Sequence, residues 1–299
     1  MVNSPGWHGV FPYLPTPIDP DGNLNAERMA WLVERVVDAG VDGVTPLGST
    51  GEGPLLSTGV RASTIEVAVD AAAGRVPVVP GVTGLATNDL VRQADQAQLL
   101  GADGVLLMLQ TYYPLAPDEV LSAVRSVVAA IDVPVVFYHR PTFCGIHLDE
   151  AIVALLHQEG GIDYFKDASG ELSNIRRWPK VAGPGLRIFA ATSVSPVAAL
   201  TSGACGLMSG PASMFPAECR ELFRCASTSD AEGARVLERS LASTLALFRT
   251  LGPNRAVKAL FAADGVDLGS PVAPVRPITP VELRAAAGCI VEVRDRRLA

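Results

Sequence analysis

The sequence is short of the residues that build disulfide frameworks, metal centres and membrane spans. Its 299 residues include only five cysteines and four histidines, and no Cys-x-x-Cys pair occurs. An odd, scattered set of thiols predicts reduced cysteines and no metal site. No apolar run reaches the roughly 18 residues that a transmembrane helix needs, so we expect no contact with a membrane.

Positive charge is in the minority. Lys and Arg number 24 against 31 Asp and Glu, which gives a net charge of -7. Such a surface repels nucleic-acid phosphates and anionic lipids, so neither is an expected partner. Residues 1–8 lack the basic and apolar segments of a signal peptide. We therefore expect a cytoplasmic protein whose partner is a small molecule.

Short apolar strands followed by helical patterns make up most of the chain. The motif Gly40-Val41-Asp42-Gly43-Val44 recurs at residues 101–105 and 203–207, each time between a helical pattern and a strand. A second motif, in which proline opens a strand, occurs at residues 75–79 and 132–136. Together with strands at residues 7–14, near Ile162 and near Leu186, these motifs predict eight strands that alternate with helices.

Near-continuous Val, Ile and Leu strands favour a parallel sheet covered on both faces. Eight such units favour a closed barrel over a doubly wound sheet, because no Gly-x-Gly-x-x-Gly follows the first strand. After Pro216 we expect only helices, at residues 217–251, 254–264 and 279–287. The predicted fold class is therefore α/β, a (β/α)8 TIM barrel over residues 1–228 with a C-terminal helical extension over residues 229–299.

In such a barrel the active site lies at the C-terminal ends of the strands. That rule selects the following segments: Gly48-Ser49-Thr50-Gly51-Glu52, Gln110-Thr111-Tyr112-Tyr113, Tyr138-His139-Arg140-Pro141, Lys166 and Ser209-Gly210. The first offers hydroxyls and backbone N–H groups between two glycines, which suits a carboxylate or phosphate. The alternative is an ordinary turn in which Ser49 or Thr50 caps a helix.

Lys166 ends the apolar strand that begins near Ile162. Desolvation there lowers the pKa of its ammonium group, so some free amine exists near neutral pH. A free amine beside a pocket attacks carbonyl carbon and forms a Schiff base. The alternative is a lysine that extends its ammonium group into water.

Side chains alternate along a strand, which separates the site residues from their neighbours. Tyr138 is either a buried core tyrosine or a partner of Lys166. His139 and Asp167 each follow one of these residues directly, so both should point toward the helices and act structurally.

These segments together make the chain resemble the dihydrodipicolinate synthase / N-acetylneuraminate lyase family, class I aldolases that work through pyruvate-type Schiff bases. The similarity runs nearly end to end. It is carried by these motifs: Pro12-Tyr13-Leu14-Pro15-Thr16-Pro17, Gly48-Ser49-Thr50-Gly51-Glu52, Tyr112-Tyr113, Tyr138-x-x-Pro141-x-x-x-Gly145, Phe165-Lys166-Asp167-Ala168-Ser169-Gly170 and Asn254-x-x-x-Lys258.

The resemblance implies a role for each matching position and no cofactor. Lys166 matches the Schiff-base lysine, and Tyr138 matches the tyrosine that relays protons. Gly48, Ser49 and Thr50 match the loop that holds the carboxylate of a 2-oxo acid. Thr50 and Tyr113 match partners in a hydroxyl relay to Tyr138. In the family that second tyrosine comes from a neighbouring subunit, which implies a homo-oligomer, either a dimer or a tetramer.

Departures from the family concern the far end of the substrate. Phe143 stands where dihydrodipicolinate synthases carry an arginine that clamps a second carboxylate. Arg140 resembles a residue of the keto-deoxy sugar-acid dehydratases. Residues 190–194 lack the acidic side chains with which sialic acid lyases hold a polyol. We expect Arg140, Phe143 and Ser209 to line the substrate pocket.

The predicted function is a Schiff-base-forming lyase, aldolase or dehydratase, acting on a 2-oxo acid. Alternatives are 4-hydroxy-tetrahydrodipicolinate synthase, which Phe143 disfavours, and a keto-deoxy sugar-acid dehydratase. A non-enzymatic 2-oxo acid sensor is a further alternative, but loss of the lysine or tyrosine would mark it. A phosphate-binding barrel enzyme would use Ser209-Gly210, where the glycine is equally explained by a tight turn.

Overall fold

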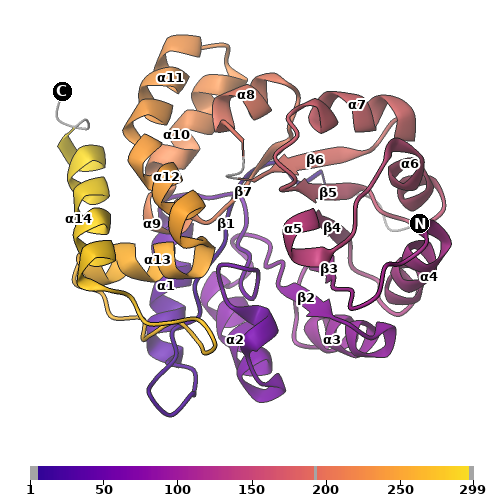
Figure 1. Ribbon diagram of the computed structural model, residues 1–299, viewed down its shortest axis with the longest axis horizontal. Coiled ribbons are helices and arrows are strands. Elements are labelled where there is room, and N and C mark those ends of the chain that lie inside the picture. The colour runs from indigo at the N-terminus through magenta and orange to yellow at the C-terminus, as the bar shows by residue number, and fades with distance from the viewer. Residues whose placement is uncertain (1–5, 192–193, 296–299) are drawn as a thin grey trace.

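The chain forms a ring of parallel strands enclosed by helices (Figure 1), seen in a computed structural model that describes residues 6–191 and 194–295. Seven strands follow one another around the ring in the order β1-β7-β6-β5-β4-β3-β2, and all their pairings are parallel. Their bounds are β1 (Gly9–Pro12), β2 (Gly81–Gly84), β3 (Val105–Leu109), β4 (Val135–His139), β5 (Tyr164–Asp167), β6 (Arg187–Ala190) and β7 (Gly206–Ser209).

The eighth strand, expected at residues 41–47, closes the ring through isolated bridges. Thr45 pairs with Tyr13 beyond β1, and Val44 pairs with Val78 ahead of β2. Backbone bonds of 2.9 Å run on both sides, from Thr45 N to Pro12 O and from Val79 N to Val44 O. Pro46 has no N–H to donate to this ladder, although its carbonyl still accepts from Gly81 N at 2.9 Å. The structure is therefore the predicted TIM barrel.

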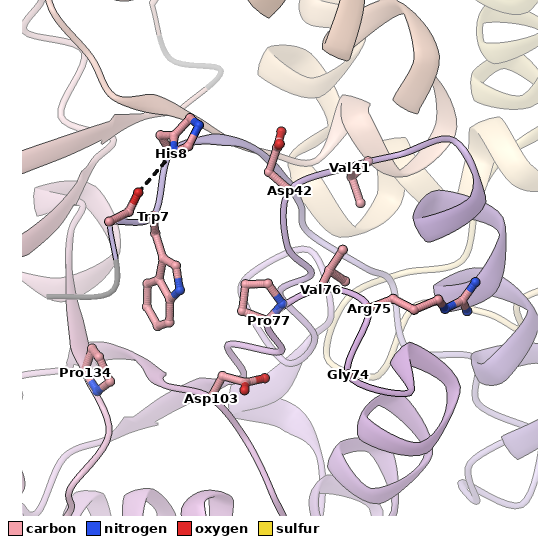
Figure 2. Close-up of a pocket in the computed structure, with 11 residues that line it drawn as sticks. Trp7, His8, Val41, Asp42, Gly74, Arg75, Val76, Pro77, Asp103 and Pro134 are labelled. Atoms are coloured by element: carbon pink, nitrogen blue, oxygen red, sulfur yellow. Dashed lines mark hydrogen bonds between the residues drawn. The ribbon is translucent and has the colours of Figure 1, made fainter. Parts of the chain in front are cut away.

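The repeated Gly-x-Asp-Gly motif has a structural role at the N-terminal ends of the strands. The carboxylate of Asp42 accepts a 2.8 Å hydrogen bond from Val10 N, and that of Asp103 accepts one from Val78 N at the same distance. Each aspartate thus binds the backbone of the preceding strand. Figure 2 shows both beside Trp7, around a cavity of about 660 Å³ at this end of the barrel.

Helices surround the ring on its outer side (Figure 1). The first begins after Asn25, which caps it, since Asn25 Oδ1 accepts a 2.9 Å bond from Arg28 N. The helices of the barrel are α1 (Ala26–Asp38), α2 (Thr58–Ala72), α3 (Thr87–Leu99), α4 (Pro117–Val128), α5 (Pro141–Cys144), α6 (Glu150–Gln158), α7 (Ser173–Ala182), α8 (Pro196–Thr201), α9 (Pro211–Met214) and α10 (Pro216–Ser227), with the short 3₁₀ helix η1 (Gly53–Leu55).

The C-terminal helices are α11 (Ala231–Ser240), α12 (Ala242–Leu251), α13 (Pro253–Ala263) and α14 (Pro280–Asp295). The single helix predicted over residues 217–251 is wrong, because these residues form three helices, α10, α11 and α12, and the first interruption follows α10. Ser229 takes a left-handed φ of 62°, and Asp230 caps a new helix by accepting from Gly233 N at 3.0 Å. The last helix also continues past residue 287, since buried Ile290 and Val293 extend its apolar face.

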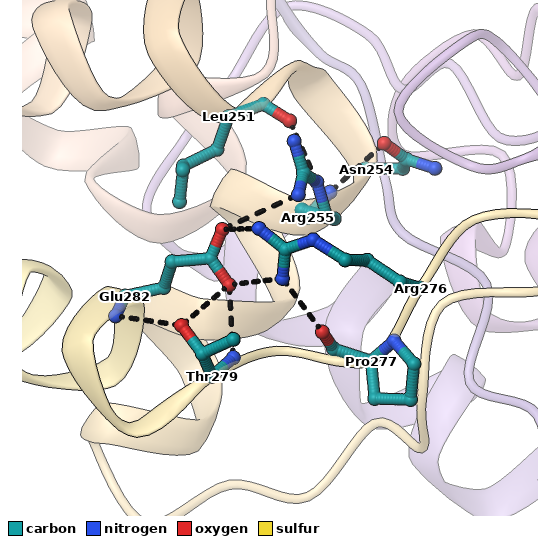
Figure 3. Close-up of polar contacts among 7 residues, drawn as sticks. All are labelled: Leu251, Asn254, Arg255, Arg276, Pro277, Thr279 and Glu282. Atoms are coloured by element: carbon teal, nitrogen blue, oxygen red, sulfur yellow. Dashed lines mark hydrogen bonds and ion pairs between the residues drawn. The ribbon is translucent and has the colours of Figure 1, made fainter.

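A charged cluster holds the start of α14 (Figure 3). Thr279 N donates to Glu282 Oε2 at 2.8 Å, and Glu282 N donates to Thr279 Oγ1 at 3.3 Å, which is a capping box. Glu282 Oε1 also pairs with Arg276 at 2.8 Å and with Arg255 of α13 at 3.3 Å. The hydrogen bonds from Arg276 and Thr279 lower the pKa of Glu282 to about 2. The carboxylate therefore fastens α14 to α13.

Within residues 6–191 and 194–295, none of the helices combines the length and the apolarity that crossing a membrane requires.

Candidate active site

Lys166 and Tyr138 face each other inside the barrel. They are partners in the parallel register of β4 and β5, so their side chains leave the sheet on the same face. The Lys166 Nζ lies 3.7 Å from the centroid of the Tyr138 ring and 4.8 Å from that of Tyr13. Lys166 is only 3% exposed. Its amine is thus enclosed by aromatic rings, and the alternative of a lysine extended into water is wrong.

Burial lowers the pKa of Lys166 below its ordinary value; Tyr138 acts in the opposite direction, and the charge of Arg140 lowers it further. Burial also acts to raise the pKa of Tyr138. The positive charges of Lys166 and Arg140 and the hydrogen bonds from Lys166 and Ser49 outweigh it, so that pKa is lowered. Both pKa values are thus lowered, which favours the neutral amine of Lys166 and makes the Tyr138 phenol a stronger proton donor than it is in water.

The loop after residue 47 brings Ser49 to Tyr138. Ser49 Oγ lies 3.3 Å from the Tyr138 hydroxyl, so the two are in hydrogen-bond contact. Thr50 is buried, and its Oγ1 lies 3.1 Å from where a Cβ on Gly210 would stand. The described contact to Tyr138 therefore comes from Ser49, and the relay through Thr50 stays a prediction.

Tyr13 is a site residue that the sequence reasoning missed. Its ring meets that of Tyr138 edge-on, with 6.3 Å between centroids and 87° between planes. Within the described chain its buried hydroxyl has no hydrogen-bond partner, and burial raises its pKa. A Cβ on Gly48 would lie only 3.0 Å from this ring, so the absence of a side chain at Gly48 leaves room for the Tyr13 ring. The strand-end rule, applied to the first strand, would have found Tyr13.

The loop at residues 47–53 is fixed at both ends. Leu47 and Glu52 adopt left-handed φ values of 60° and 58°, which non-glycine residues hold only when their surroundings enforce it. Thr16 Oγ1 donates to Gly51 O, and Arg61 donates to Gly53 O, both at 2.6 Å. The cap of α2 is Ser57. The alternative in which Ser49 or Thr50 caps that helix is therefore wrong.

Arg140 lies against Phe143 and close enough to Tyr138 and Lys166 for its charge to act on both, although it is not among the residues that line the nearby cavity. Its guanidinium carbon stands 3.9 Å from the centroid of the Phe143 ring. The Nε atom is buried and, among the described residues, has no hydrogen-bond partner. Its charge lowers the pKa of both Tyr138 and Lys166. Arg140 thus presents a cation to the inside of the site, while Phe143 remains 41% exposed.

A cavity of about 390 Å³ opens beside Ser49 and Phe143. Pro253 and Asn254, at the start of α13, line it as well, so the C-terminal helices contribute one wall. No sequence pattern marked Pro253, and Asn254 entered only as part of a resembling motif. The remaining lining residues are Glu52, Pro54, Leu55, Met108, Gln110 and Thr142.

His139 and Asp167 point away from the site, as predicted. His139 Nδ1 lies 3.0 Å from Asp167 Oδ1, and the His139 ring packs 5.3 Å from Trp178 of α7. Asp167 also accepts from Ser169 N at 3.0 Å and from Asn174 at 3.2 Å. This outer layer joins the two strands behind the reactive pair.

The remaining predicted residues lie at the rim or outside the described chain. Tyr113 is 72% exposed and stacks edge-on against Tyr112 at 4.9 Å. Ser209 is buried at the end of β7, where its carbonyl accepts from Tyr13 N at 2.9 Å. Thr192 and Ser193, part of the segment compared with sialic acid lyases, lie outside the described residues. In the part of the chain that is described, no three His, Cys, Asp or Glu side chains gather to hold a metal ion.

Known proteins are similar to this chain in sequence and in fold. The profile of the dihydrodipicolinate synthetase family matches residues 7–290. An uncharacterised DapA-like lyase of Halobacterium salinarum is 35% identical over 91% of this chain and 89% of its own. A 4-hydroxy-tetrahydrodipicolinate synthase of Acidiphilium cryptum is 29% identical over 94% and 97%. The crystal structure of dihydrodipicolinate synthase from Agrobacterium tumefaciens superposes with a TM-score of 0.90 at 25% identity, covering 96% of this chain and 98% of that one. The chain therefore belongs to the dihydrodipicolinate synthetase family of lyases.

Proposed function

We propose that the protein is a Schiff-base-forming lyase, an aldolase or dehydratase, that acts on a 2-oxo acid. The observation that carries the proposal is the buried Lys166 amine against the Tyr138 ring, with Ser49 in contact with the Tyr138 hydroxyl. The sequence holds three lysines. Lys258 forms a buried ion pair with Glu52, and Lys180 is exposed on α7. Lys166 is therefore the lysine whose amine lies in the site.

The chemistry follows from these groups. The neutral amine attacks carbon 2 of the oxo acid, a C–N bond forms, the nitrogen gives up one proton and the carbonyl oxygen takes one. Uptake of a second proton lets that oxygen leave as water, and a protonated imine remains. Tyr138 is placed to give and regain these protons, and Ser49 connects it to the loop. The N–H groups and hydroxyls at residues 48–50 suit the substrate carboxylate.

The protonated imine then draws electrons from the substrate. In an aldolase the hydroxyl on carbon 4 loses its proton, the bond between carbons 3 and 4 breaks and an aldehyde leaves, and carbon 3 of the remaining enamine takes a proton. In a dehydratase carbon 3 loses a proton and the hydroxyl on carbon 4 leaves as water. Hydrolysis of the imine returns the Lys166 amine in both cases.

A second candidate is 4-hydroxy-tetrahydrodipicolinate synthase, the name carried by several relatives. Phe143 disfavours it because an aromatic ring cannot clamp a second carboxylate. A keto-deoxy sugar-acid dehydratase is favoured only by Arg140. A 2-oxo acid sensor would not need the aligned pair of Lys166 and Tyr138. We also propose a cytoplasmic location, in keeping with five unpaired cysteines.

Pyruvate with borohydride should add irreversible mass to the wild-type protein and none to Lys166→Ala, because reduction traps only an imine. Lys180→Ala, which removes an exposed lysine of α7, is the matched control and should be labelled like the wild type. Intact-mass spectrometry measures the adduct. Labelling of Lys166→Ala would place the nucleophile elsewhere.

Tyr138→Phe should lower turnover by about 10²-fold or more, the usual effect of losing a general acid–base group. The ring itself stays, so its packing against Tyr13 and the melting temperature should persist. Tyr164→Phe is the control, since it removes a buried strand hydroxyl that accepts from Trp7 N at 2.9 Å. Steady-state kinetics of the two variants decide the matter: equal turnover would make Tyr138 a core residue.

The protein should sediment as a dimer or tetramer, because we propose that the exposed Tyr113 completes the relay of a neighbouring subunit. Tyr113→Phe should then lower turnover and leave the sedimentation coefficient unchanged. Sedimentation velocity at the enzyme concentration of the assay measures this. A fully active monomer would remove Tyr113 from the relay.

Activity should favour a 2-oxo acid whose far end is apolar, aromatic or singly charged, over condensation of pyruvate with aspartate semialdehyde. Arg140→Ala should reduce kcat/KM for acidic substrates by about 10- to 100-fold, the value of a hydrogen bond to a charge, and spare neutral ones. Rates are compared across pH, since losing the Arg140 charge lets the pKa of Tyr138 and Lys166 rise. Efficient dihydrodipicolinate synthase activity would contradict this assignment of Phe143.

A further inference from the structure

A buried ion pair joins the proposed carboxylate loop to the C-terminal helices. Glu52 Oε2 lies 2.6 Å from Lys258 Nζ, and both side chains are 0% exposed. Glu52 Oε1 accepts from Val272 N at 2.8 Å and from Asn254 Nδ2 at 3.3 Å. Lys258 also donates to Ser270 O at 2.8 Å. One carboxylate at the end of the loop thus contacts α13 and the segment that follows it.

Glu52 is well placed to control the loop. It lies three residues from Ser49, and both line the 390 Å³ cavity. Its backbone has a left-handed φ of 58°, a strained conformation that the surroundings must hold in place. The contacts of its side chain therefore help to hold the backbone of the loop. A Cβ on Gly51 would lie 2.7 Å from Leu14 O, so the loop packs closely against the segment that follows β1. The residues between Glu52 and Ser49 therefore have little room to change conformation.

Stability alone does not account for such a pair. Removing two charges from water is costly, and well-packed apolar residues in the same place are often equally stable or more so. What an ion pair adds is direction, because its oxygens and hydrogens must meet at fixed distances. Here those directions converge on the loop that holds Ser49.

We propose that Glu52 and Lys258 are positioning residues through which the C-terminal helices fix the carboxylate-binding loop and so set the affinity for the 2-oxo acid. The inference rests on the proposed function. Among the described residues, the contacts of Glu52 and Lys258 do not include Lys166 or Tyr138. The imine chemistry is therefore assigned to Lys166 and Tyr138. Losing the ion pair weakens substrate binding before it slows turnover.

The experiment compares the double variant Glu52→Gln/Lys258→Met with Glu282→Gln. The double variant removes both charges together, so no unpaired charge remains buried and the protein keeps its fold. Glu282→Gln removes another ion-paired carboxylate, 8% exposed, that fastens α14 but is not among the contacts of the loop. Each variant is measured by thermal unfolding, by KM and kcat with 2-oxo acids, and by hydrogen exchange of residues 47–53.

The double variant should raise KM by about tenfold, keep kcat within about threefold and speed hydrogen exchange of the loop. Glu282→Gln should lower the melting temperature while KM and loop exchange stay at wild-type values. The single variant Glu52→Gln should lose affinity at least as strongly, since it leaves the Lys258 charge unpaired.

Unchanged loop exchange in the double variant, or an unchanged KM, would overturn the inference. So would equal effects in Glu282→Gln, which would mean general loosening of the C-terminal helices. A wild-type protein that forms no imine with any 2-oxo acid would refute the proposed function instead. Hydrogen exchange needs no substrate, so it still decides whether the ion pair holds the loop.

Discussion

The enclosure of the Lys166 amine between the rings of Tyr138 and Tyr13 is the interaction on which the site depends. An ammonium group in that space loses its hydration, and the cation–π attraction of the two rings offsets only part of the lost solvation free energy. The charged form is therefore disfavoured, and burial is the largest influence on the Lys166 pKa. A closed barrel provides such a space, because side chains from neighbouring strands converge at its end.

Strand register explains why the amine and the phenol meet while the next residues do not. Tyr138 pairs with Lys166, and His139 pairs with Asp167 one residue later on the opposite face. The inner pair is the one to which we assign the chemistry, whereas the outer pair bonds the two strands and contacts Trp178. A slip of one residue between β4 and β5 would separate both pairs. The outer hydrogen bond therefore supports the alignment that the inner chemistry requires.

Much of this arrangement could be predicted from the sequence, because two local rules suffice for it. The strand-end rule selected Lys166 and Tyr138, and alternation along a strand predicted the outward direction of His139 and Asp167. Other features depend on long-range contacts. Pro253 reaches the cavity from a helix about 200 positions beyond the loop that it faces, and no local pattern encodes that approach. The break near Ser229 depends on a left-handed residue and an aspartate cap within a sequence that otherwise has helical periodicity.

The two halves of the site obey different physical constraints. Around Lys166 the side chains are buried and tightly apposed, so a substitution there changes either proton affinity or packing. Toward the mouth, Phe143 is partly exposed, and Arg140 Nε has no hydrogen-bond partner among residues 6–191 and 194–295, while Asn254 lines the cavity from α13. Changes at the mouth leave the register of β4 and β5 in place, although the charge of Arg140 also reaches the Lys166 amine and lowers its pKa. We therefore propose that rim and C-terminal residues select the far end of the substrate and that the barrel interior carries the imine chemistry, with the Glu52–Lys258 pair joining the two regions.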